Sequence, residues 1–223
     1  MKKTYWIILF LLTLSGNLAG ILTNDTVVIR ICKPLLVIIL AAYFLWQLAG
    51  QKSRLKTWLL CALAFSWIGD VLLLFDNQHS LFFLLGLSAF LLAHVCYIYF
   101  FHCIRIQESV NGRALLLVVV VLYYAVLMSI LSPFLGSMKL PVRVYGVVIS
   151  FMLMLAMHML FINERKAGRW MFTGALLFVI SDSVLAVNKF YQPFAFAPVL
   201  IMITYGLAQL FITQGAIEYI GHD

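Results

Sequence analysis

Residues 62–74, ALAFSWIGDVLLL, form an apolar run that contains one carboxylate, Asp70. A similar run returns much later, where residues 175–185 read ALLFVISDSVL and contain Asp182. The chain has only eight acidic residues, and these two lie well inside apolar runs. A carboxylate in the hydrocarbon region of a membrane costs about 2.5–3.5 kcal/mol on insertion scales, so it normally faces the protein interior or a wet cavity.

Apolar side chains dominate all 223 residues of the chain. Hydrophobic residues make up 65% and charged residues 10%, and the mean hydropathy is +1.06, whereas soluble domains carry about 25% charged residues. Apolar runs close to the ~20 residues that cross ~30 Å of hydrocarbon cover residues 4–22, 30–50, 56–75, 80–103, 112–132, 142–162, 169–188 and 194–217. We predict an all-α, polytopic membrane helix bundle with eight transmembrane helices, forming one domain over residues 1–223.

The formal net charge of +7 would suggest a nucleic-acid partner in a soluble protein. Here the basic residues lie in short connections, where the preference of Lys and Arg for the cytoplasmic side explains them better. With a cytoplasmic N-terminus, the inner side carries Lys2, Lys3, Lys52, Arg54, Lys56, Arg105, Arg113, Arg165, Lys166 and Arg169. The outer side carries Arg30, Lys33, Lys139, Arg143 and Lys189. We predict cytoplasmic termini, a bacterial inner membrane because the loops are short, and no nucleic-acid partner.

The two carboxylates share a depth and a local sequence. In this topology Asp70 and Asp182 each lie about six residues from the outer end of their span, or ~9 Å below the outer boundary. Each carboxylate follows an Ala-Leu-x-Phe segment, and the two spans that carry them are the third and the seventh of the chain. Four spans per half indicate a parallel 4+4 internal repeat, related by an axis along the membrane normal.

The pair has a structural and a functional interpretation. Each carboxylate could lock its helix to a neighbour through a Ser, Tyr or Lys side chain. Alternatively, both face one cavity, where burial and mutual repulsion leave one protonated and the other ionised, which provides one acid and one base. A proton-coupled transporter would also use such a pair, although the obvious Gly/Pro-broken helices of many transporters are missing from the sequence.

Other polar residues inside the predicted spans are candidates for lining the same cavity. They are His94 and Tyr97 on one face of the fourth span, Tyr123 and Tyr124 in the fifth, and Tyr205 and Gln209 on one face of the eighth. At the outer boundary stand Lys33, with Pro34 in the first turn of the second span, and the pair Asn188 and Lys189. The ammonium groups of Lys33 and Lys189 could extend to the membrane surface, face the carboxylates or bind a lipid phosphate. We predict no metal, because HxxxH and HExxH patterns are missing and Asp70, Asp182 and His94 alone would make a sparse site.

Taken in order along the chain, these residues resemble the YhhN-like lysoplasmalogenase family of eight-span membrane proteins. The matching features are Lys33-Pro34, Gly69-Asp70, the face Gly86–Phe90–His94–Tyr97, Gly174-Ala175 with Phe178 and Ser181-Asp182, and Tyr205 with Ala208-Gln209. The resemblance implies hydrolysis of the vinyl-ether bond of lysoplasmalogens to a fatty aldehyde and glycerophospho-ethanolamine or -choline. It thus implies a lysophospholipid substrate, water and surrounding membrane lipid as partners.

The chemistry of vinyl-ether hydrolysis suits two carboxylates and needs no cofactor. Protonation of the β-carbon leaves an oxocarbenium ion, much as in glycoside hydrolysis, where one acid donates a proton and one carboxylate stabilises the cation or activates water. We expect Asp70 and Asp182 to share these roles, without assigning the acid. The expected substrate-binding residues are Lys33, His94, Tyr97, Tyr124, Asn188, Lys189, Tyr205 and Gln209. A transporter or a structural bundle stays the alternative, and head-group preference and oligomeric state stay open.

Overall fold

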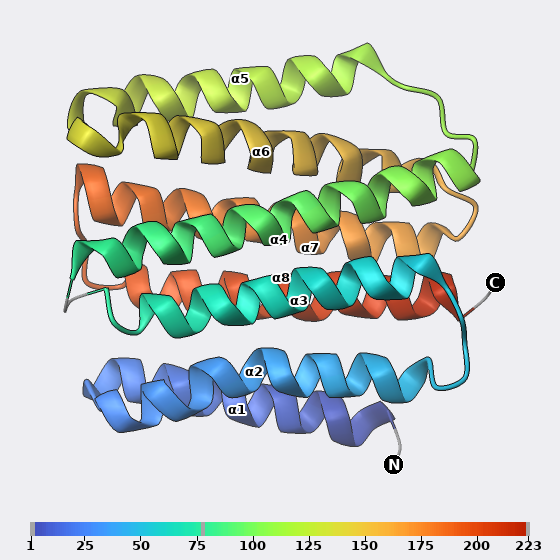
Figure 1. Cartoon of the computed structure of the whole chain (residues 1–223), viewed down its shortest axis with the longest axis horizontal. Helices are drawn as coiled ribbons and strands as arrows, with labels where there is room; N and C mark the ends of the chain where they lie inside the picture. The colour runs from blue at the N-terminus through green and yellow to red at the C-terminus, as the bar shows by residue number, and fades with distance from the viewer. Residues whose placement is uncertain (1–2, 77–78, 222–223) are drawn as a thin grey trace.

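The computed structural model describes residues 3–76 and 79–221, and every regular element in these residues is helical (Figure 1). The long helices are α1 (Lys3–Thr23), α2 (Thr26–Gln47), α3 (Arg54–Leu73), α4 (Ser80–Gln107), α5 (Ala114–Leu131), α6 (Lys139–His158), α7 (Arg165–Ala186) and α8 (Ala197–Ile220). All eight are long and apolar enough to cross a membrane. The predicted all-α fold with eight spans is confirmed, and the protein is a multi-pass membrane protein.

Short irregular turns extend several of these helices. The 3₁₀ turns η1 (Ser132–Phe134) and η2 (Gly136–Met138) join α5 to α6, and η3 (Met159–Phe161) follows α6. A π-helical turn, η4 (Val187–Tyr191), continues α7. Single π turns occur often at functional sites, and η4 carries two of the residues singled out from the sequence.

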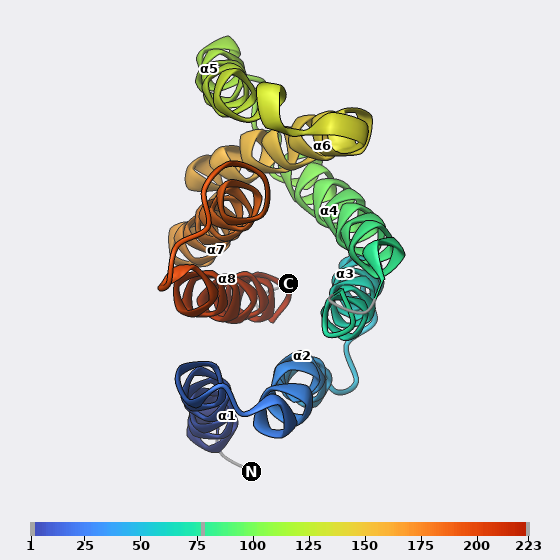
Figure 2. The same cartoon turned by 90° about the vertical axis from the view of Figure 1, so that its left-hand side faces the viewer.

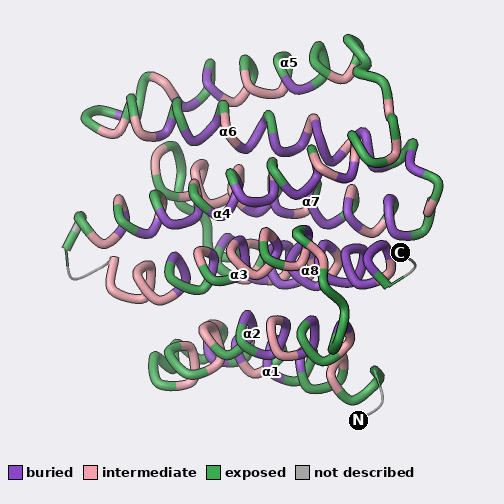
Figure 3. Tube along the Cα trace, turned by 45° about the vertical axis from the view of Figure 1, so that its right-hand side comes forward, coloured by how far each residue is buried: buried purple, intermediate pink, exposed green. Residues whose placement is uncertain are grey.

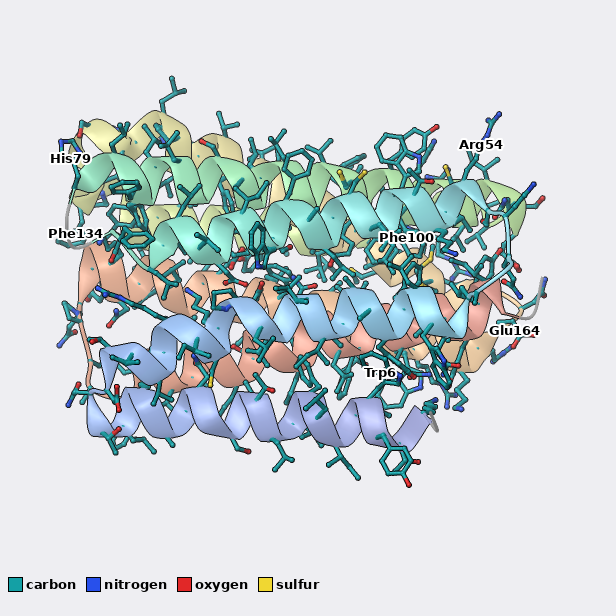
Figure 4. The ribbon with its side chains drawn as sticks, turned by 60° about the horizontal axis from the view of Figure 1, so that its bottom comes forward. Trp6, Arg54, His79, Phe100, Phe134 and Glu164 are labelled. Atoms are coloured by element: carbon teal, nitrogen blue, oxygen red, sulfur yellow. The ribbon has the colours of Figure 1, made fainter. Side chains whose placement is uncertain are left out.

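The start of α2 differs from the prediction. Asp25 caps the helix by accepting hydrogen bonds from the backbone N–H groups of Val27 and Val28, so α2 begins at Thr26. Pro34 therefore lies inside the helix, and the expectation that it occupies the first turn was wrong. A proline there removes one backbone hydrogen bond and bends the helix, and Figure 4 shows α2 bending along its length. The shift also places Lys33 two turns inside the helix instead of at the boundary.

The helices form a broken ring around α8. Seen end on, α1, α2, α3, α4, α6 and α7 follow one another around the molecule, and α5 lies outside against α6 (Figure 2). α8 packs mainly on α7 and also contacts α1, α2 and α3. Figure 3 shows α8 largely buried and α5 largely exposed. Side chains from most of the ring can therefore meet around α8.

Two glycines bring α7 and α8 into close contact. A Cβ atom at Gly174 would lie 2.8 Å from the carbonyl oxygen of Ala208, and one at Gly215 would lie 2.8 Å from that of Ala167. Small residues at such crossings let membrane helices approach closely. The corresponding pairs α3–α4 and α7–α8 both pack closely, while the 4+4 repeat itself stays a prediction.

The molecule has two ends that differ in what they carry. Both termini lie at one end, here called the terminal end, and the connections α1–α2, α3–α4, α5–α6 and α7–α8 lie at the other, here called the distal end (Figure 1). His79 and Phe134 stand at the distal end, and Arg54 and Glu164 at the terminal end (Figure 4). Asp70 and Asp182 lie in the last turns of α3 and α7, on the distal side.

Candidate active site

Asp70 is the centre of a buried, charged cluster that joins three helices. Its side chain is 1% exposed. The Lys33 ammonium of α2 lies 3.7 Å from its Oδ1, and the Tyr205 hydroxyl of α8 donates a 2.6 Å hydrogen bond to its Oδ2. A cation and a hydrogen-bond donor beside a buried carboxylate favour its anionic form over that of an unpaired carboxylate. The Asp70 cluster, comprising Lys33, Asp70 and Tyr205, therefore pairs one carboxylate with a cation and a donor.

A chain of hydrogen bonds orients the hydroxyl of Tyr205. The Tyr97 hydroxyl of α4 donates to Oε1 of Gln209 at 2.6 Å, and Nε2 of Gln209 donates to the Tyr205 oxygen at 3.4 Å. Because that oxygen already accepts a hydrogen bond, its own proton is directed to Asp70. The structure thus brings together five residues that the sequence analysis singled out, namely Lys33, Asp70, Tyr97, Tyr205 and Gln209.

Asp182 has neutral partners. The Tyr145 hydroxyl of α6 donates a hydrogen bond to its Oδ2, and Nε2 of His94 lies 3.6 Å from the same oxygen. Nδ1 of His94 is 2.6 Å from the Phe90 carbonyl, which can only accept, so Nδ1 carries the ring proton and Nε2 presents a lone pair. In the described part of the chain, no Lys or Arg lies within ion-pair distance of Asp182. Asp182, Tyr145 and His94 form the Asp182 cluster.

The two tyrosines of α5 occupy different surroundings. Ser183 donates to the Val179 carbonyl at 2.6 Å, so the Tyr123 hydroxyl, 2.8 Å away, donates to Ser183 beside Asp182. Tyr124 instead packs on Gly146 of α6, and its hydroxyl reaches the Arg143 carbonyl at 3.5 Å. Among the described contacts, none joins Tyr124 to either cluster. The residue of this pair that the geometry brings near Asp182 is Tyr123.

An aromatic partition lies between the two clusters. The Phe178 ring has its centroid 4.7 Å from that of His94 and 5.5 Å from that of Tyr205. The Phe90 ring is 5.8 Å from Tyr205 and 6.3 Å from Phe178. Both rings are buried. Each carboxylate therefore lies within its own set of polar contacts, and the Phe178 ring contacts a member of each cluster.

Residues of the two clusters line two neighbouring cavities. A cavity of about 410 Å³ opens at the distal end, and Lys33 lines it. A narrow cavity of about 40 Å³ is lined by Asp182 and Tyr145. Leu73, Phe83 and Leu185 line both, so the narrow cavity adjoins the larger one. Asp182 lines the narrow cavity and Asp70 lines neither, so neither of these two cavities is the single cavity expected to hold both carboxylates.

The large cavity has a polar rim. Arg30, Asp76 and Asn188 line it with Lys33. Lys189, expected to bind phosphate, pairs with Asp76 at 2.9 Å and lies 4.7 Å from the centroid of the Phe83 ring. Lys33 likewise already has a carboxylate partner. Arg30 is the cation of this cavity that has no carboxylate within ion-pair distance among residues 3–76 and 79–221.

Sequence reasoning missed Tyr145 and did not consider Arg30 as a site residue. The sixth span was predicted to begin at residue 142, only three residues before Tyr145. Because α6 begins at Lys139, Tyr145 lies almost two turns inside the helix. In the described part of the chain, no group of three or more His, Cys, Asp or Glu side chains is arranged to hold a metal ion.

Comparison with known proteins assigns the chain to a family. The YhhN family model matches residues 28–216. The chain belongs to the YhhN family. This matched segment includes both carboxylate clusters and begins beyond α1. No solved structure matches the chain.

Several relatives of the chain carry the name of an enzyme. Lysoplasmalogenase TMEM86B of Rattus norvegicus is 35% identical over 188 residues, which cover 84% of this chain and 71% of the relative. Lysoplasmalogenase TMEM86A of Homo sapiens is 34% identical over 197 residues, covering 84% and 76%. The lysoplasmalogenase of Mycobacterium tuberculosis is 32% identical over 186 residues, covering 82% and 68%. The likeness therefore extends over most of the membrane bundle.

Proposed function

We propose that this YhhN family member hydrolyses the vinyl-ether bond of lysoplasmalogens. The named relatives support the reaction class. The observation that carries the proposal on this chain is the unequal pair of intramembrane carboxylates: Asp70 has a cation partner at 3.7 Å, and Asp182 has neutral ones. Acid-catalysed cleavage of a vinyl ether needs one group that gives a proton and one negative charge near the cation that forms.

The proposed reaction is balanced by one water molecule. A proton adds to the β-carbon of the vinyl ether, and the α-carbon and ether oxygen share the positive charge of an oxocarbenium ion. Water adds to the α-carbon and loses a proton, giving a hemiacetal. The hemiacetal collapses to a fatty aldehyde and the glycerol oxygen, which takes up a proton to leave a glycerophospho-head group.

Asp182 is the better candidate for the proton donor. A carboxylate with no cation beside it, at the wall of an apolar cavity, is far less costly when protonated than when charged. The lone pair on Nε2 of His94, 3.6 Å from Asp182, can hold or return the proton. A positioned acid of this kind contributes typically 10²–10⁴-fold in rate.

Asp70 is the better candidate for the permanent negative charge. With Lys33 and Tyr205 as partners it stays ionised, and its preorganised field favours a cation that develops across the aromatic partition. The proton lost by the attacking water would instead be accepted on the Asp182 side of the partition, by the Asp182 carboxylate after it has donated its proton or by the lone pair on Nε2 of His94. Gln209 and Tyr97 would keep the Tyr205 hydroxyl directed at Asp70 through the cycle.

The orientation predicted from the basic residues is part of the proposal. We infer that both termini face the cytoplasm of a bacterial inner membrane and that the large cavity opens toward the outer leaflet. Ten Lys and Arg residues on the terminal side against five on the distal side support this. A C-terminal fusion should then be fluorescent with a cytoplasmic reporter and inactive with alkaline phosphatase, and the reverse result would contradict the orientation.

Isotope incorporation tests the proposed reaction directly. The purified protein, incubated with a lysoplasmenyl-ethanolamine in D₂O, should release a fatty aldehyde that carries one deuterium at the carbon next to the carbonyl. The saturated 1-O-alkyl lysolipid should stay intact, because it has no double bond to protonate. Unlabelled aldehyde incubated with the protein in D₂O corrects for exchange. Release of aldehyde without deuterium, or no release, would contradict the proposal.

A further inference from the structure

Asn17 of α1 is a buried polar residue that the proposed reaction does not yet use. Its side chain is completely buried and lines the large cavity. Its Nδ2 donates to the carbonyl of Ile29 at 3.5 Å, and this contact fixes which end of the amide is which, because a carbonyl needs a donor. Its Oδ1 has no hydrogen-bond partner in the described part of the chain. A buried acceptor without a hydrogen bond costs free energy of folding, and a ligand in the cavity that Asn17 lines could supply the missing donor.

Asn17 lies close to two cations of α2, Arg30 and Lys33, that line the same cavity. Ile29, its partner, is one helical turn from Lys33, whose ammonium lies 3.7 Å from Asp70. Arg30 follows Ile29 along α2 and lines the same cavity, about one turn nearer to the start of the helix than Lys33. Among the described residues, the cavity therefore presents a cation without a carboxylate partner and an unpaired acceptor at one level, about one helical turn nearer to the distal end than Lys33 and the Asp70 cluster.

A lysolipid presents groups that match this cation, this acceptor and the carboxylates. Its glycerol carries the phosphate on one terminal carbon, a free hydroxyl on the middle carbon and the vinyl ether on the other terminal carbon. A phosphate at Arg30 and a vinyl ether at the narrow cavity beside Asp182 place the hydroxyl between them. A hydroxyl is a donor, which the carboxamide oxygen requires. A phospholipid acylated at this carbon has no donor there and adds bulk.

We propose that Oδ1 of Asn17 accepts a hydrogen bond from the free glycerol hydroxyl, and that this contact selects lysolipids over lipids acylated at that carbon. The assignment rests on the proposed function for the identity of the ligand, but it is a statement about binding. Asn17 lies in α1, before the segment that the family model matches.

Binding of ligands that cannot react separates this proposal from the proposed reaction. The probes are 1-O-alkyl-glycero-3-phosphocholine, in which the glycerol hydroxyl is the one hydrogen-bond donor, and its 2-deoxy and 2-O-methyl analogues. Affinities are measured for protein in lipid nanodiscs, with empty nanodiscs as the blank. The wild type should bind the hydroxyl form about tenfold more tightly than either analogue, as one net hydrogen bond implies. This ligand series uses the wild type alone and needs no variant to fold.

Two variants complete the test. Asn17→Leu keeps the side-chain size and removes the acceptor, so it should bind all three ligands equally and at the affinity of the deoxy form. Arg30→Gln is the matched control and should weaken all three by the same factor. A wild type that does not discriminate, or an Asn17→Leu variant that still does, would overturn the proposal. If the wild type discriminates between the ligands but releases no aldehyde from a lysoplasmalogen, Asn17 still binds the glycerol hydroxyl and the proposed reaction is rejected.

Discussion

The Asp70 and Asp182 clusters start from similar sequences and end in different chemistry. Each carboxylate lies near the distal end of its helix and accepts a hydrogen bond from a tyrosine, Tyr205 for Asp70 and Tyr145 for Asp182. Beyond that tyrosine the two differ, because Asp70 has Lys33 beside it and Asp182 has the uncharged Nε2 of His94. The local motif thus specifies a carboxylate and its depth, and neighbouring helices decide which groups surround it.

This difference follows from which helices reach each site. α2 bends at its internal proline and brings a lysine to α3, whereas α4 and α6 bring a histidine and a tyrosine to α7. An ion pair in an apolar interior needs both partners, while a carboxyl group among neutral donors and acceptors can keep its proton. The comparison therefore predicts that equivalent mutations at the two sites have unequal effects.

The largest expected effect is on the rate, from Asp182→Asn. Asparagine keeps the size and the hydrogen bond from Tyr145 but cannot donate a proton to carbon. We expect the rate of aldehyde release to fall by about 10²–10⁴-fold, the usual contribution of a general acid, with little change in unfolding temperature because no charge is removed. Aldehyde release from lysoplasmalogen and thermal unfolding in the same detergent measure both quantities. A stable variant with full activity would exclude Asp182 as the acid.

The next effect is on stability, from Lys33→Met. This change leaves Asp70 buried without its cation, which costs about 3–5 kcal/mol when one partner of a buried pair is removed. The double variant Lys33→Met/Asp70→Asn removes both charges and should regain most of the loss. Its activity should stay low, because the negative charge near the oxocarbenium ion is gone.

A second outcome of the same pair of variants is informative. If Lys33→Met is as stable as the wild type, the ion pair is solvated and the compensated character of the Asp70 cluster is wrong. If the double variant is both stable and fully active, Asp70 serves as a helix lock, which was the structural interpretation of the sequence.

The sequence predicted the helices well and their ends less well. Runs of about 20 apolar residues identify a membrane helix by length alone, so all eight were found. The ends depend on caps and local turns. Asp25 starts α2 earlier than the apolar run suggests, and α6 starts at Lys139 instead of residue 142. These shifts of three or four residues moved Pro34 from the expected first turn into the helix interior and placed Tyr145 almost two turns inside α6.

The sequence alone could predict the two carboxylates of the candidate site but not all of the side chains that contact them. Asp70 and Asp182 stand out because acidic residues are rare in apolar runs. Tyrosine is common in membrane helices, so Tyr123, Tyr124 and Tyr145 cannot be ranked without knowing which face of each helix meets α7. That information lies in how helices far apart in the sequence pack, and no local pattern carries it.

A smaller effect should separate the two tyrosines that hold the carboxylates. Tyr205→Phe removes a donor to an ionised carboxylate, and such hydrogen bonds are worth about 1.5–3 kcal/mol. Tyr145→Phe removes a donor to a carboxyl group that is neutral in the proposal, worth about 0.5–1.5 kcal/mol. The free energies of unfolding of the two variants, measured side by side in one detergent, should differ in this direction. Equal losses would mean that the two carboxylates carry the same charge.

The smallest expected effect is that of Tyr124→Phe, which tests the sequence-based inclusion of Tyr124 in the site. Its hydroxyl reaches only a backbone carbonyl at 3.5 Å on an exposed stretch, so activity should stay within about twofold and stability within about 0.5 kcal/mol, as for surface substitutions. Tyr123→Phe is the matched variant one residue away. It loses a 2.8 Å hydrogen bond to Ser183 beside Asp182, and aldehyde release should fall by about tenfold, the worth of one neutral hydrogen bond. The reverse order of these two rates would mean that the fifth helix presents its other face to the reacting lipid, and the Asp182 cluster would then need Tyr124 in place of Tyr123.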